Sequence, residues 1–349
     1  MIQRNDVYKY KYFNFYYVYM KSTAVANANI ALVKYWGKRD KELMLPQNSS
    51  ISMTCDGMST ATTVEFGNYK KDIFVLDGRE FKQGTEYNEV TGFLDIVRKK
   101  AEIKQKAKIV SQNNMPTAAG LASSASGFAA LALASSKAAG LDLNEKELSM
   151  LARRGSGSAS RSIGEGFVEW YRGEKPDGLD SYAESIAFKE HWPEFRMLAV
   201  VVSKKEKKIK SRAGMAQTVA NCSLYPCWLN TIEDDLKIIR NGIKKKNFTQ
   251  VGERSQLNCL KMHATMMSTT PPIIYWNPTT IEIMHSVIEW NENELESYFT
   301  VDAGPQVKII CLKKNVPEIE KRLKKISNIE RVIECRPGDG AKLIHNHLF

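Results

Sequence analysis

The segment from Leu121 to Ala139 consists largely of alanine, serine, leucine and glycine, and it constrains the fold more than any other part of the chain. Alanine and leucine favour helix, and side chains this small allow a helix to pack very close to its neighbours. A strand expected at about 107–111 and the loop Asn113–Gly120 precede it. We therefore expect a strand that leads through a glycine-containing loop into a tightly packed helix.

The start of this helix is a candidate phosphate site. Backbone N–H groups there lack partners within the helix, and the helix dipole favours negative charge. Ser123 and Ser124 add hydroxyl groups, and Ser124 also offers a ligand for a metal ion. The segment is not a Walker loop, because no Gly-Lys-Ser/Thr follows. Tight packing alone would explain the same composition, so this segment does not decide between the two interpretations.

Strands and helices mix along the chain without regular alternation, which is typical of an α+β fold. We expect strands at about 22–35, 49–66, 73–76, 197–202, 298–301 and 307–312 and at the C-terminus, and helices around 90–97 and at about 144–153, 211–220, 231–245, 248–267, 278–290 and 317–326. Asp77-Gly78 indicates a hairpin, and Asn144 with Glu147 has the spacing of a helix capping box. The charge-rich stretch at about 203–210 is the best candidate boundary. It divides an extension (1–19) and an N-terminal domain (20–203) from a C-terminal domain (204–349).

Three further segments carry groups suited to anion binding or proton transfer. Lys34 ends an apolar run, so it emerges from a buried strand, and a tight bend at Tyr35–Lys38 follows. Arg154–Arg161 reads as a flexible loop rich in donors, in which Arg161 could clamp a carboxylate or a phosphate. Asp302 ends an apolar strand before a Gly-Pro turn, where a carboxylate can act as an acid/base or steering group. Surface lysines, a Gly/Ser linker and a turn-forming aspartate would explain each segment singly, but their joint occurrence favours function.

The charge balance narrows the class of partner. The 349 residues carry a formal net charge of +11, which suits nucleic acid, an anionic membrane or a polyanionic small molecule. The basic stretches Lys204–Lys210 and Lys244–Lys246 lack interleaved aromatic residues, and no RNP-type, zinc-finger or GxxG pattern occurs. No apolar run reaches the length of about 20 residues that spans a bilayer. We therefore expect a cytoplasmic protein with a small-molecule substrate and with neither nucleic acid nor membrane as partner.

The cysteines and the start of the chain add two expectations. The six cysteines form no CxxC pair and no zinc spacing, so we expect them to be reduced and mostly buried. Residues 1–19 are rich in Tyr, Phe and Lys and have neither a clean apolar core nor a cleavage site, so they do not form a signal peptide. We expect them to be dispensable, with the functional chain beginning at Met20.

Five segments, in one order along residues 22–345, together resemble the diphosphomevalonate decarboxylases of the GHMP kinase superfamily. They are NIALVKYWGKRD (29–40), LPQNSSIS (45–52), NNMPTAAGLASSASGFAAL (113–131), RRGSGSASRS (153–162) with GFVEW (166–170), and FTVDAGP (299–305). The serine-rich segment alone indicates only the superfamily. The KYWGK and VDAGP elements narrow the resemblance to the decarboxylases.

The resemblance implies a GHMP-kinase fold. Its N-terminal domain has a left-handed βαβ unit, its C-terminal domain is ferredoxin-like, and the active site lies in the cleft between them. It also implies a homodimer that uses ATP and Mg²⁺. The implied reaction converts (R)-5-diphosphomevalonate into isopentenyl diphosphate, ADP, phosphate and CO₂ through phosphorylation of the 3-hydroxyl, in the mevalonate pathway of isoprenoid synthesis.

We assign the family's residue roles only to positions of this chain that match the motifs. The matched catalytic residues are Asp302, Lys34, Arg161 and Asn29. The residues matched to ATP are Asn113, Pro116, Gly120, Leu121, Ala122, Ser123 and Ser124, with Ser124 also the candidate Mg²⁺ ligand. Those matched to the substrate are Tyr35, Lys38, Ser156, Ser158, Arg161, Ser211, Arg212 and Met215.

Two residues depart from the family pattern, and two other functions stay open. Ser160 and Glu165 are atypical of their motif, and Glu165 would add a negative charge near a polyanion. The nearest alternative is a relative in the same superfamily that acts on mevalonate or its monophosphate. A non-catalytic, nucleic-acid-binding relative is a second alternative, which the presence of Asp302 and of the serine loop disfavours.

Overall fold

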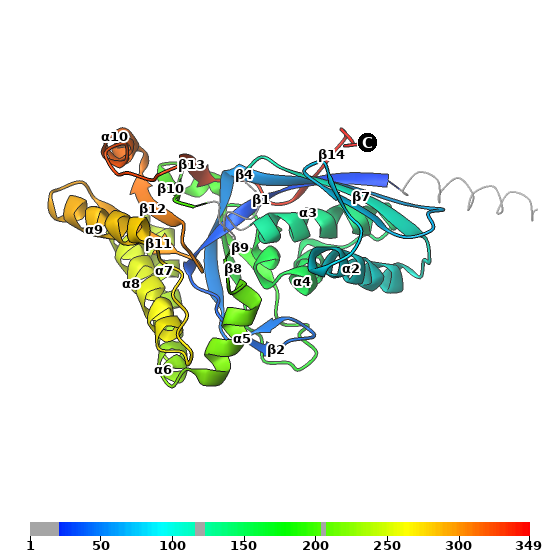
Figure 1. Ribbon diagram of the computed structural model, residues 1–349, viewed down its shortest axis with the longest axis horizontal. Helices are drawn as coiled ribbons and strands as arrows, with labels where there is room; N and C mark the ends of the chain where they lie inside the picture. Colours follow the sequence, from blue (N-terminus) through cyan, green and yellow to red (C-terminus); the bar gives the residue numbers. More distant parts are fainter. Residues whose placement is uncertain (1–20, 116–122, 204–206) are drawn as a thin grey trace, which may run out of the picture.

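The computed structural model describes residues 21–115, 123–203 and 207–349, and Figure 1 shows their arrangement. Within these residues a 12-stranded sheet runs through both halves of the chain, with the path β11-β12-β10-β13-β4-β7-β5-β6. Strand β1 pairs with β4 and β14, and β8 pairs with β4 and β9. A mixed α+β architecture is therefore confirmed.

The N-terminal half forms the right side of Figure 1, where α2, α3 and α4 lie along one face of the sheet. Its elements are β1 (Lys21–Val33), β2 (Lys38–Asp40), β3 (Leu45–Pro46), β4 (Ser50–Gly67), β5 (Ile73–Leu76), β6 (Arg79–Phe81), α2 (Thr85–Ala101), β7 (Lys106–Asn113), α3 (Ser123–Ala138), α4 (Glu145–Gly155), the 3₁₀ turn η1 (Gly157–Ser162), β8 (Phe167–Trp170) and β9 (Ala183–Ala187). Strands β5 and β7 are parallel, and the chain passes from one to the other through β6 and α2. This is the βαβ connection that the resemblance implies.

Helix α3 is the tightly packed helix that its composition predicts. Ala125, Ala129 and Ala132 are fully buried, and the helix contacts β1, β4, α4 and η1. Small side chains bring these backbones close together, so the start of α3 lies near the ends of several other elements. The capping box of α4, in which the Asn144 side chain accepts a hydrogen bond from the Glu147 N–H, is also confirmed.

The C-terminal half has the order of a ferredoxin-like fold. Its elements are β10 (Phe195–Val201), α5 (Ser211–Asn221), α6 (Tyr225–Leu229), α7 (Ile232–Lys245), α8 (Phe248–Met267), α9 (Pro278–Glu292), β11 (Ser297–Val301), β12 (Val307–Leu312), α10 (Val316–Leu323) and β13 (Arg331–Pro337), followed by β14 (Lys342–Ile344), which joins β1. Helices separate β10 from β11 and β12 from β13, and the four strands are antiparallel in the order β11-β12-β10-β13. This is a β-α-β-β-α-β arrangement. The domain boundary after residue 203 stays a prediction; it would assign β10 to the N-terminal half, although both strands beside β10 follow residue 300.

The two halves share one hydrophobic core. It joins Ile30 and Trp36 from the N-terminal half to Met197, Met262 and Tyr298 from the C-terminal half. Because this core is continuous, the ends of β1 and β11 are held in a common frame. Residues carried on those strand ends therefore have a defined separation.

The segment Arg154–Arg161 corrects one expectation. Instead of a flexible loop, the structure has the last turn of α4 followed by η1, and most of η1 is buried. A Cβ atom on Gly157 would lie 2.8 Å from the Tyr35 hydroxyl and 2.9 Å from the Trp170 ring. The glycine therefore serves close packing rather than chain freedom.

All six cysteines are free, and all except Cys227 are buried, as expected. No helix in the described part of the chain is both long and apolar enough to cross a membrane. Residues 1–19, with their expected dispensability, lie outside the described residues.

Candidate active site

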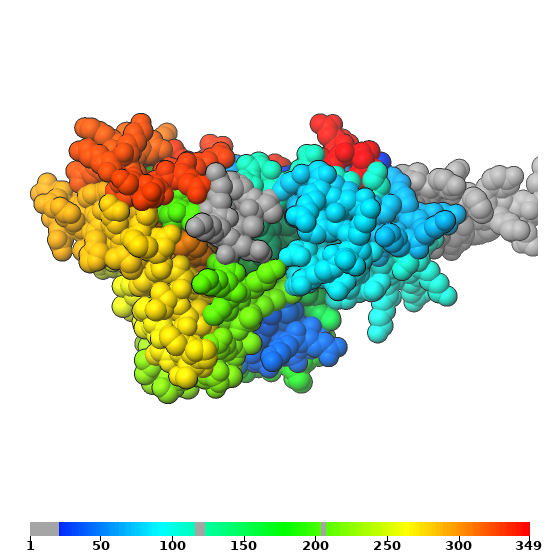
Figure 2. Space-filling view, in the orientation of Figure 1, coloured from blue at the N-terminus to red at the C-terminus, as the bar shows by residue number. Residues whose placement is uncertain are grey.

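A pocket of about 670 Å³ is formed by residues from both halves of the chain. Figure 2 shows the two halves at the surface, with the green residues around α5 between the yellow helices of the C-terminal half and the cyan segments of the N-terminal half. The residues that line it include some from the end of β1, the starts of α3 and α5, η1, and the turn after β11.

The pocket brings together every site residue expected from the sequence that the structure describes. These are Asn29, Lys34, Tyr35, Lys38, Asn113, Ser123, Ser124, Ser156, Ser158, Arg161, Ser211, Arg212, Met215 and Asp302. Pro116, Gly120, Leu121 and Ala122 lie outside the described residues. Positions far apart in the sequence thus converge on one cavity.

Asp302 lies between two buried lysines. Its Oδ1 is 2.7 Å from the Lys34 ammonium, and its Oδ2 is 3.2 Å from that of Lys308. The lysine side chains are 1% and 0% exposed, whereas Asp302 keeps 29% exposure toward the pocket. Burial would raise the pKa of Asp302, but the two lysine charges hold it well below its usual range. The carboxylate is therefore ionised and a weak base.

Arg161 is a buried cation whose hydrogen-bond partners are all neutral. Its Nε donates to Asn29 Oδ1 (3.2 Å) and Ser52 Oγ (3.0 Å), and one terminal nitrogen donates to Ser50 Oγ (2.6 Å). Burial lowers its pKa to about 10, so the guanidinium stays charged at neutral pH. In the described part of the chain no carboxylate lies within ion-pair distance of Arg161. A buried charge without a partner is costly, so this arrangement suits an anionic ligand.

Asn29 sets the orientation of Arg161. Its Nδ2 donates to the Ser158 carbonyl (2.9 Å) and to the Ser162 hydroxyl (2.8 Å), which aims its carbonyl oxygen at the guanidinium. The guanidinium carbon lies over the Trp170 ring, 5.9 Å from the ring centroid. The side chain of Arg161 is therefore fixed before any ligand binds.

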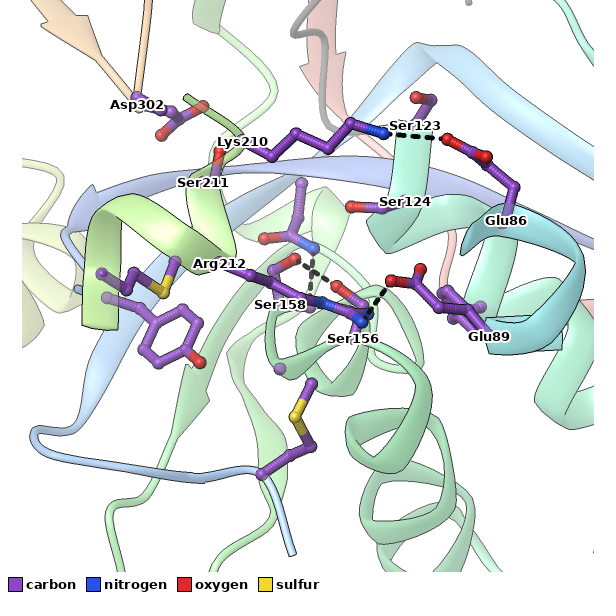
Figure 3. Close-up of a pocket in the computed structure, with 18 of the residues that line it drawn as sticks. Glu86, Glu89, Ser123, Ser124, Ser156, Ser158, Lys210, Ser211, Arg212 and Asp302 are labelled. Atoms are coloured by element: carbon purple, nitrogen blue, oxygen red, sulfur yellow. Dashed lines mark hydrogen bonds and ion pairs between the residues drawn. The ribbon is translucent and has the colours of Figure 1, made fainter. Parts of the chain in front are cut away.

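A row of hydroxyl groups and cations forms the middle of the pocket. Figure 3 shows Ser156, which precedes η1, and Ser158 on η1 facing the start of α5, where Lys210, Ser211 and Arg212 lie. Burial and the nearby charge of Arg212 lower the pKa of Lys38 to about 8. The Tyr35 hydroxyl is buried without a hydrogen-bond partner among the described residues. Phosphate oxygens would supply the acceptors that these donors need.

Two glutamates on α2 form ion pairs with two cations at the start of α5. Glu86 lies 3.0 Å from the Lys210 ammonium and Glu89 lies 2.6 Å from Arg212, as the dashed lines in Figure 3 mark. Arg212 also donates to the Gly155 carbonyl at 2.6 Å. These exposed ion pairs join the two halves across the pocket, and a phosphate group could replace either glutamate.

Beyond Ser123 and Ser124, the pocket becomes apolar. The side chains there come from β5, α2, β7 and α3, and include Phe74, Leu76, Val90, Ile109, Phe128 and Leu131. The start of α3 therefore lies between an apolar compartment and a cationic one. A nucleotide, with a flat base and a charged phosphate tail, has this division of character.

Sequence reasoning missed part of the site. Lys308 was detectable as a lone lysine inside the apolar strand Val307–Leu312. Ser50 and Ser52 stood within a quoted motif without a role. Glu86 and Glu89 look like ordinary residues of an exposed helix face, so no local signal distinguished them.

Neither residue that departs from the family pattern lines the pocket. Ser160 is fully buried and donates to the Gly157 carbonyl at 2.7 Å, so it stabilises η1. The backbone of Glu165 bonds the Ser185 hydroxyl, and Glu165 is not among the pocket residues. The expected negative charge beside a bound polyanion is therefore wrong, because the chain has left the pocket by residue 165.

Comparison with known proteins agrees with this geometry. Residues 26–183 match the diphosphomevalonate decarboxylase-like N-terminal domain, and residues 197–343 match the mevalonate 5-diphosphate decarboxylase C-terminal domain. The diphosphomevalonate decarboxylase of Candida albicans is 40% identical over 302 residues, which is 82% of this chain and 83% of that protein.

Solved structures agree over nearly the whole length. A mevalonate diphosphate decarboxylase from Staphylococcus aureus has a TM-score of 0.89 and 40% identity, covering 93% of this chain and 98% of its own. A structure described as MDDEF in complex with MVAPP, AMPPCP and magnesium has a TM-score of 0.88 and 42% identity, covering 94% and 99%. With both domains matched and the pocket assembled from both halves, this chain belongs to the diphosphomevalonate decarboxylase family.

Proposed function

We propose that this protein catalyses the ATP-dependent decarboxylation of (R)-5-diphosphomevalonate to isopentenyl diphosphate, with ADP, phosphate and CO₂ as the other products. The observation that carries the proposal is the meeting, in one pocket, of Asp302, which pairs with Lys34 and Lys308, and the buried Arg161, which has no carboxylate partner among the described residues. Two polyanions must bind together for this reaction, which requires such clustered cations. The reaction is a step of the mevalonate pathway.

The chemistry explains why each group is needed. Hydroxide is a poor leaving group from a tertiary carbon, so ATP first converts the 3-hydroxyl into a phosphate ester. Departure of phosphate leaves positive character at that carbon. Loss of CO₂ from the adjacent carboxymethyl arm then supplies the electron pair that forms the alkene.

Asp302 would accept a hydrogen bond from the 3-hydroxyl and orient its oxygen toward the transferring phosphoryl group. Its pKa, held well below the usual range, makes it better suited to this orienting role than to strong base catalysis. Lys34 would keep Asp302 ionised and stabilise the negative charge of the phosphoryl group. The fully buried Lys308 would contribute to the first of these roles from the opposite oxygen.

Arg161 would bind the substrate carboxylate through two parallel hydrogen bonds. Its Nε and one terminal nitrogen are held by Asn29, Ser52 and Ser50, so the guanidinium is fixed relative to Asp302. The breaking carbon–carbon bond would thereby be aligned with the departing phosphate. Asn29 acts here through Arg161.

The diphosphate would bind among the donors in the middle of the pocket. The proposed set is Tyr35, Lys38, Ser156, Ser158, Ser211 and Arg212, with Met215 lining the wall. ATP would place its phosphates at Ser123 and Ser124 and its base in the apolar compartment. We propose that Asn113 and positions 116 and 120–122 also contact ATP.

Mg²⁺ fits the site as an ion held by phosphates. No group of three or more His, Cys, Asp or Glu in the described residues could hold a metal ion. Mg²⁺ commonly takes few protein ligands and binds phosphate oxygens together with water. Ser124, a pocket residue in the first turn of α3, is the protein group proposed to contact it. The ion would neutralise phosphate charge during transfer.

We also propose a cytoplasmic homodimer without nucleic-acid or membrane partners. The free cysteines suit a reducing compartment, and the basic pocket offers a use for the positive charge that does not involve nucleic acid. Light scattering on the purified protein tests the dimer. A salt-dependent DNA-binding titration tests the absence of a nucleic-acid function.

The substrate test compares 5-diphosphomevalonate with 5-phosphomevalonate. A monophosphate cannot satisfy all the donors of the central pocket, and each buried donor left unpaired costs about 1–3 kcal/mol. We expect at least about tenfold higher catalytic efficiency with the diphosphate. Arg212→Ala should reduce that preference by weakening the diphosphate, whereas Arg161→Ala should slow both substrates. Equal efficiencies with the wild-type enzyme would instead favour a monophosphate-using relative.

A further inference from the structure

Helix α8 contacts the backbone of both members of the Lys34–Asp302 pair. Asn258, Cys259, Met262 and His263 lie on one side of this helix at spacings of one to five residues. All four are buried, and only Met262 is among the pocket residues. The other three do not line the pocket, so they can affect the site only through the residues they contact.

Asn258 holds the peptide that carries Lys34. Strand β1 ends at Val33, so the Lys34 N–H has passed the end of the sheet; it donates to Asn258 Oδ1 at 2.8 Å. The Asn258 Nδ2 in turn donates to Asp235 at 2.7 Å. Asn258 is fully buried in mid-helix, and both ends of its amide are satisfied. Its orientation is thus fixed, and with it the position of the Lys34 backbone.

Ion pairs hold the Asp235 side chain in place. It is fully buried on α7 and forms ion pairs with Lys261 (2.7 Å) and Arg254 (3.2 Å), both on α8. At the other backbone group of the same residue, the Asn48 amide donates to the Lys34 carbonyl at 2.8 Å. The backbone N–H and C=O of Lys34 therefore both bond to side chains rather than to a neighbouring strand.

His263 holds the peptide that carries Asp302. Its Nε2 lies 2.8 Å from the Asp302 carbonyl oxygen and 3.3 Å from that of Val301. Burial lowers the pKa of His263 to about 3, so the ring is neutral, and a neutral ring must present its N–H at Nε2 to bond a carbonyl. The Val301 N–H donates to the Cys259 sulfur at 3.1 Å. The end of β11 is therefore attached to α8 one residue before the catalytic carboxylate.

We propose that Asn258 and His263 are positioning residues that set the separation of the Lys34 ammonium and the Asp302 carboxylate by fixing the two backbones to one rigid helix. The inference rests on the proposed function, in which this pair orients the 3-hydroxyl and the phosphoryl group. Neither side chain touches a reacting atom. A shift of the reacting groups of about 1 Å can cost roughly a hundredfold in rate, so small backbone displacements matter here.

The test is a pair of double-mutant cycles on the full-length enzyme with ATP and 5-diphosphomevalonate. Asn258→Ala removes the acceptor of the Lys34 N–H, and His263→Phe removes the donor to the Asp302 carbonyl. We expect each to lower kcat per folded molecule by roughly tenfold or more while the KM of both substrates changes far less. In the Lys34→Met background, Asn258→Ala should lower kcat no further. In the Asp302→Asn background, the same should hold for His263→Phe.

Two variants separate positioning from general support of the fold. Val251→Ala removes buried volume from the same helix where it packs on Gly242 of α7, away from both peptides, and should lower the melting temperature with little effect on kcat. Asn258→Asp combined with Asp235→Asn exchanges the two groups and keeps an acceptor for the Lys34 N–H, so it should recover most of the kcat that Asn258→Ala loses. Should Asn258→Ala fail to fold, the His263 cycle carries the same test through Asp302.

The outcomes are distinguishable. If Asn258→Ala and His263→Phe reduce kcat by the same factor with and without Lys34 or Asp302, they act on the fold as a whole and the positioning role is wrong. A wild-type kcat in both single variants would overturn it as well. If Lys34→Met and Asp302→Asn leave CO₂ release at the wild-type rate, the error lies in the proposed function of the pair rather than in the role of α8.

Discussion

Replacing Asp302 by asparagine keeps the shape of the side chain but removes its charge, and the structure predicts two separate consequences. Lys34 and Lys308 are 1% and 0% exposed, and Asp302 is the carboxylate that bonds both, at 2.7 and 3.2 Å. Breaking a buried ion pair typically costs about 3–5 kcal/mol, because a buried charge is left unbalanced. Since Asp302 is itself 29% exposed to the pocket, water and ions offset part of that cost. We expect Asp302→Asn to lower the free energy of unfolding by at least about 2 kcal/mol.

The same substitution should lower turnover by at least about a hundredfold, the usual scale for loss of a positioned catalytic group. Urea unfolding gives the stability change, and release of CO₂ gives the rate. Adding Lys308→Met to Asp302→Asn removes one unbalanced charge, so it should restore part of the stability without restoring turnover. Unchanged stability in Asp302→Asn would refute the charge balance inferred for the two lysines. Near-normal turnover would remove Asp302 from the mechanism.

Three further predictions concern binding, packing and the start of the chain. The KM for 5-diphosphomevalonate should rise as the pH passes upward through about 8, where Lys38 loses its proton and its attraction for the diphosphate; the variant Lys38→Met should show a flatter profile, and an identical profile would contradict the role of this lysine. Ala129→Leu should destabilise the protein by about 1–3 kcal/mol in thermal or urea unfolding, because this fully buried residue of α3 has no room for a larger side chain; unaltered stability would argue against close packing. A chain beginning at Met20 should fold and keep its activity, and a large loss of solubility or turnover would show that residues 1–19 are needed.

The sequence predicted the parts of the fold that depend on local pattern. The alanine and serine run of α3, the capping box at Asn144 and the hairpin at Asp77-Gly78 each follow from propensity or turn chemistry, and all three are present. The short strands β2, β3, β8 and β9 were missed. Strand β8 pairs with β4, which is distant in the sequence, whereas β3 pairs with the nearby β2. Segments this short carry little periodicity of their own.

The candidate site, like the fold, could be predicted from the sequence only in part. Motif matching named many of the residues that line the pocket, and the structure places all of the described ones there. It could not reveal that Lys308 lies opposite Lys34, because the two lysines come together only at Asp302, once the two halves pack into a shared core. The flexibility expected of Arg154–Arg161 was wrong because glycine and serine also serve close packing, which local composition does not distinguish.

The central claim is that one pocket couples consumption of ATP to decarboxylation of a diphosphorylated substrate. Its most direct test is the stoichiometry of the purified enzyme with ATP, Mg²⁺ and 5-diphosphomevalonate, with ADP and CO₂ measured in the same reaction. The pairing of Lys34 with Asp302, beside an Arg161 free to bind a carboxylate, predicts one CO₂ for each ADP throughout the time course. Formation of ADP without CO₂, leaving a stable phosphorylated product, would contradict the claim and identify the protein as a kinase.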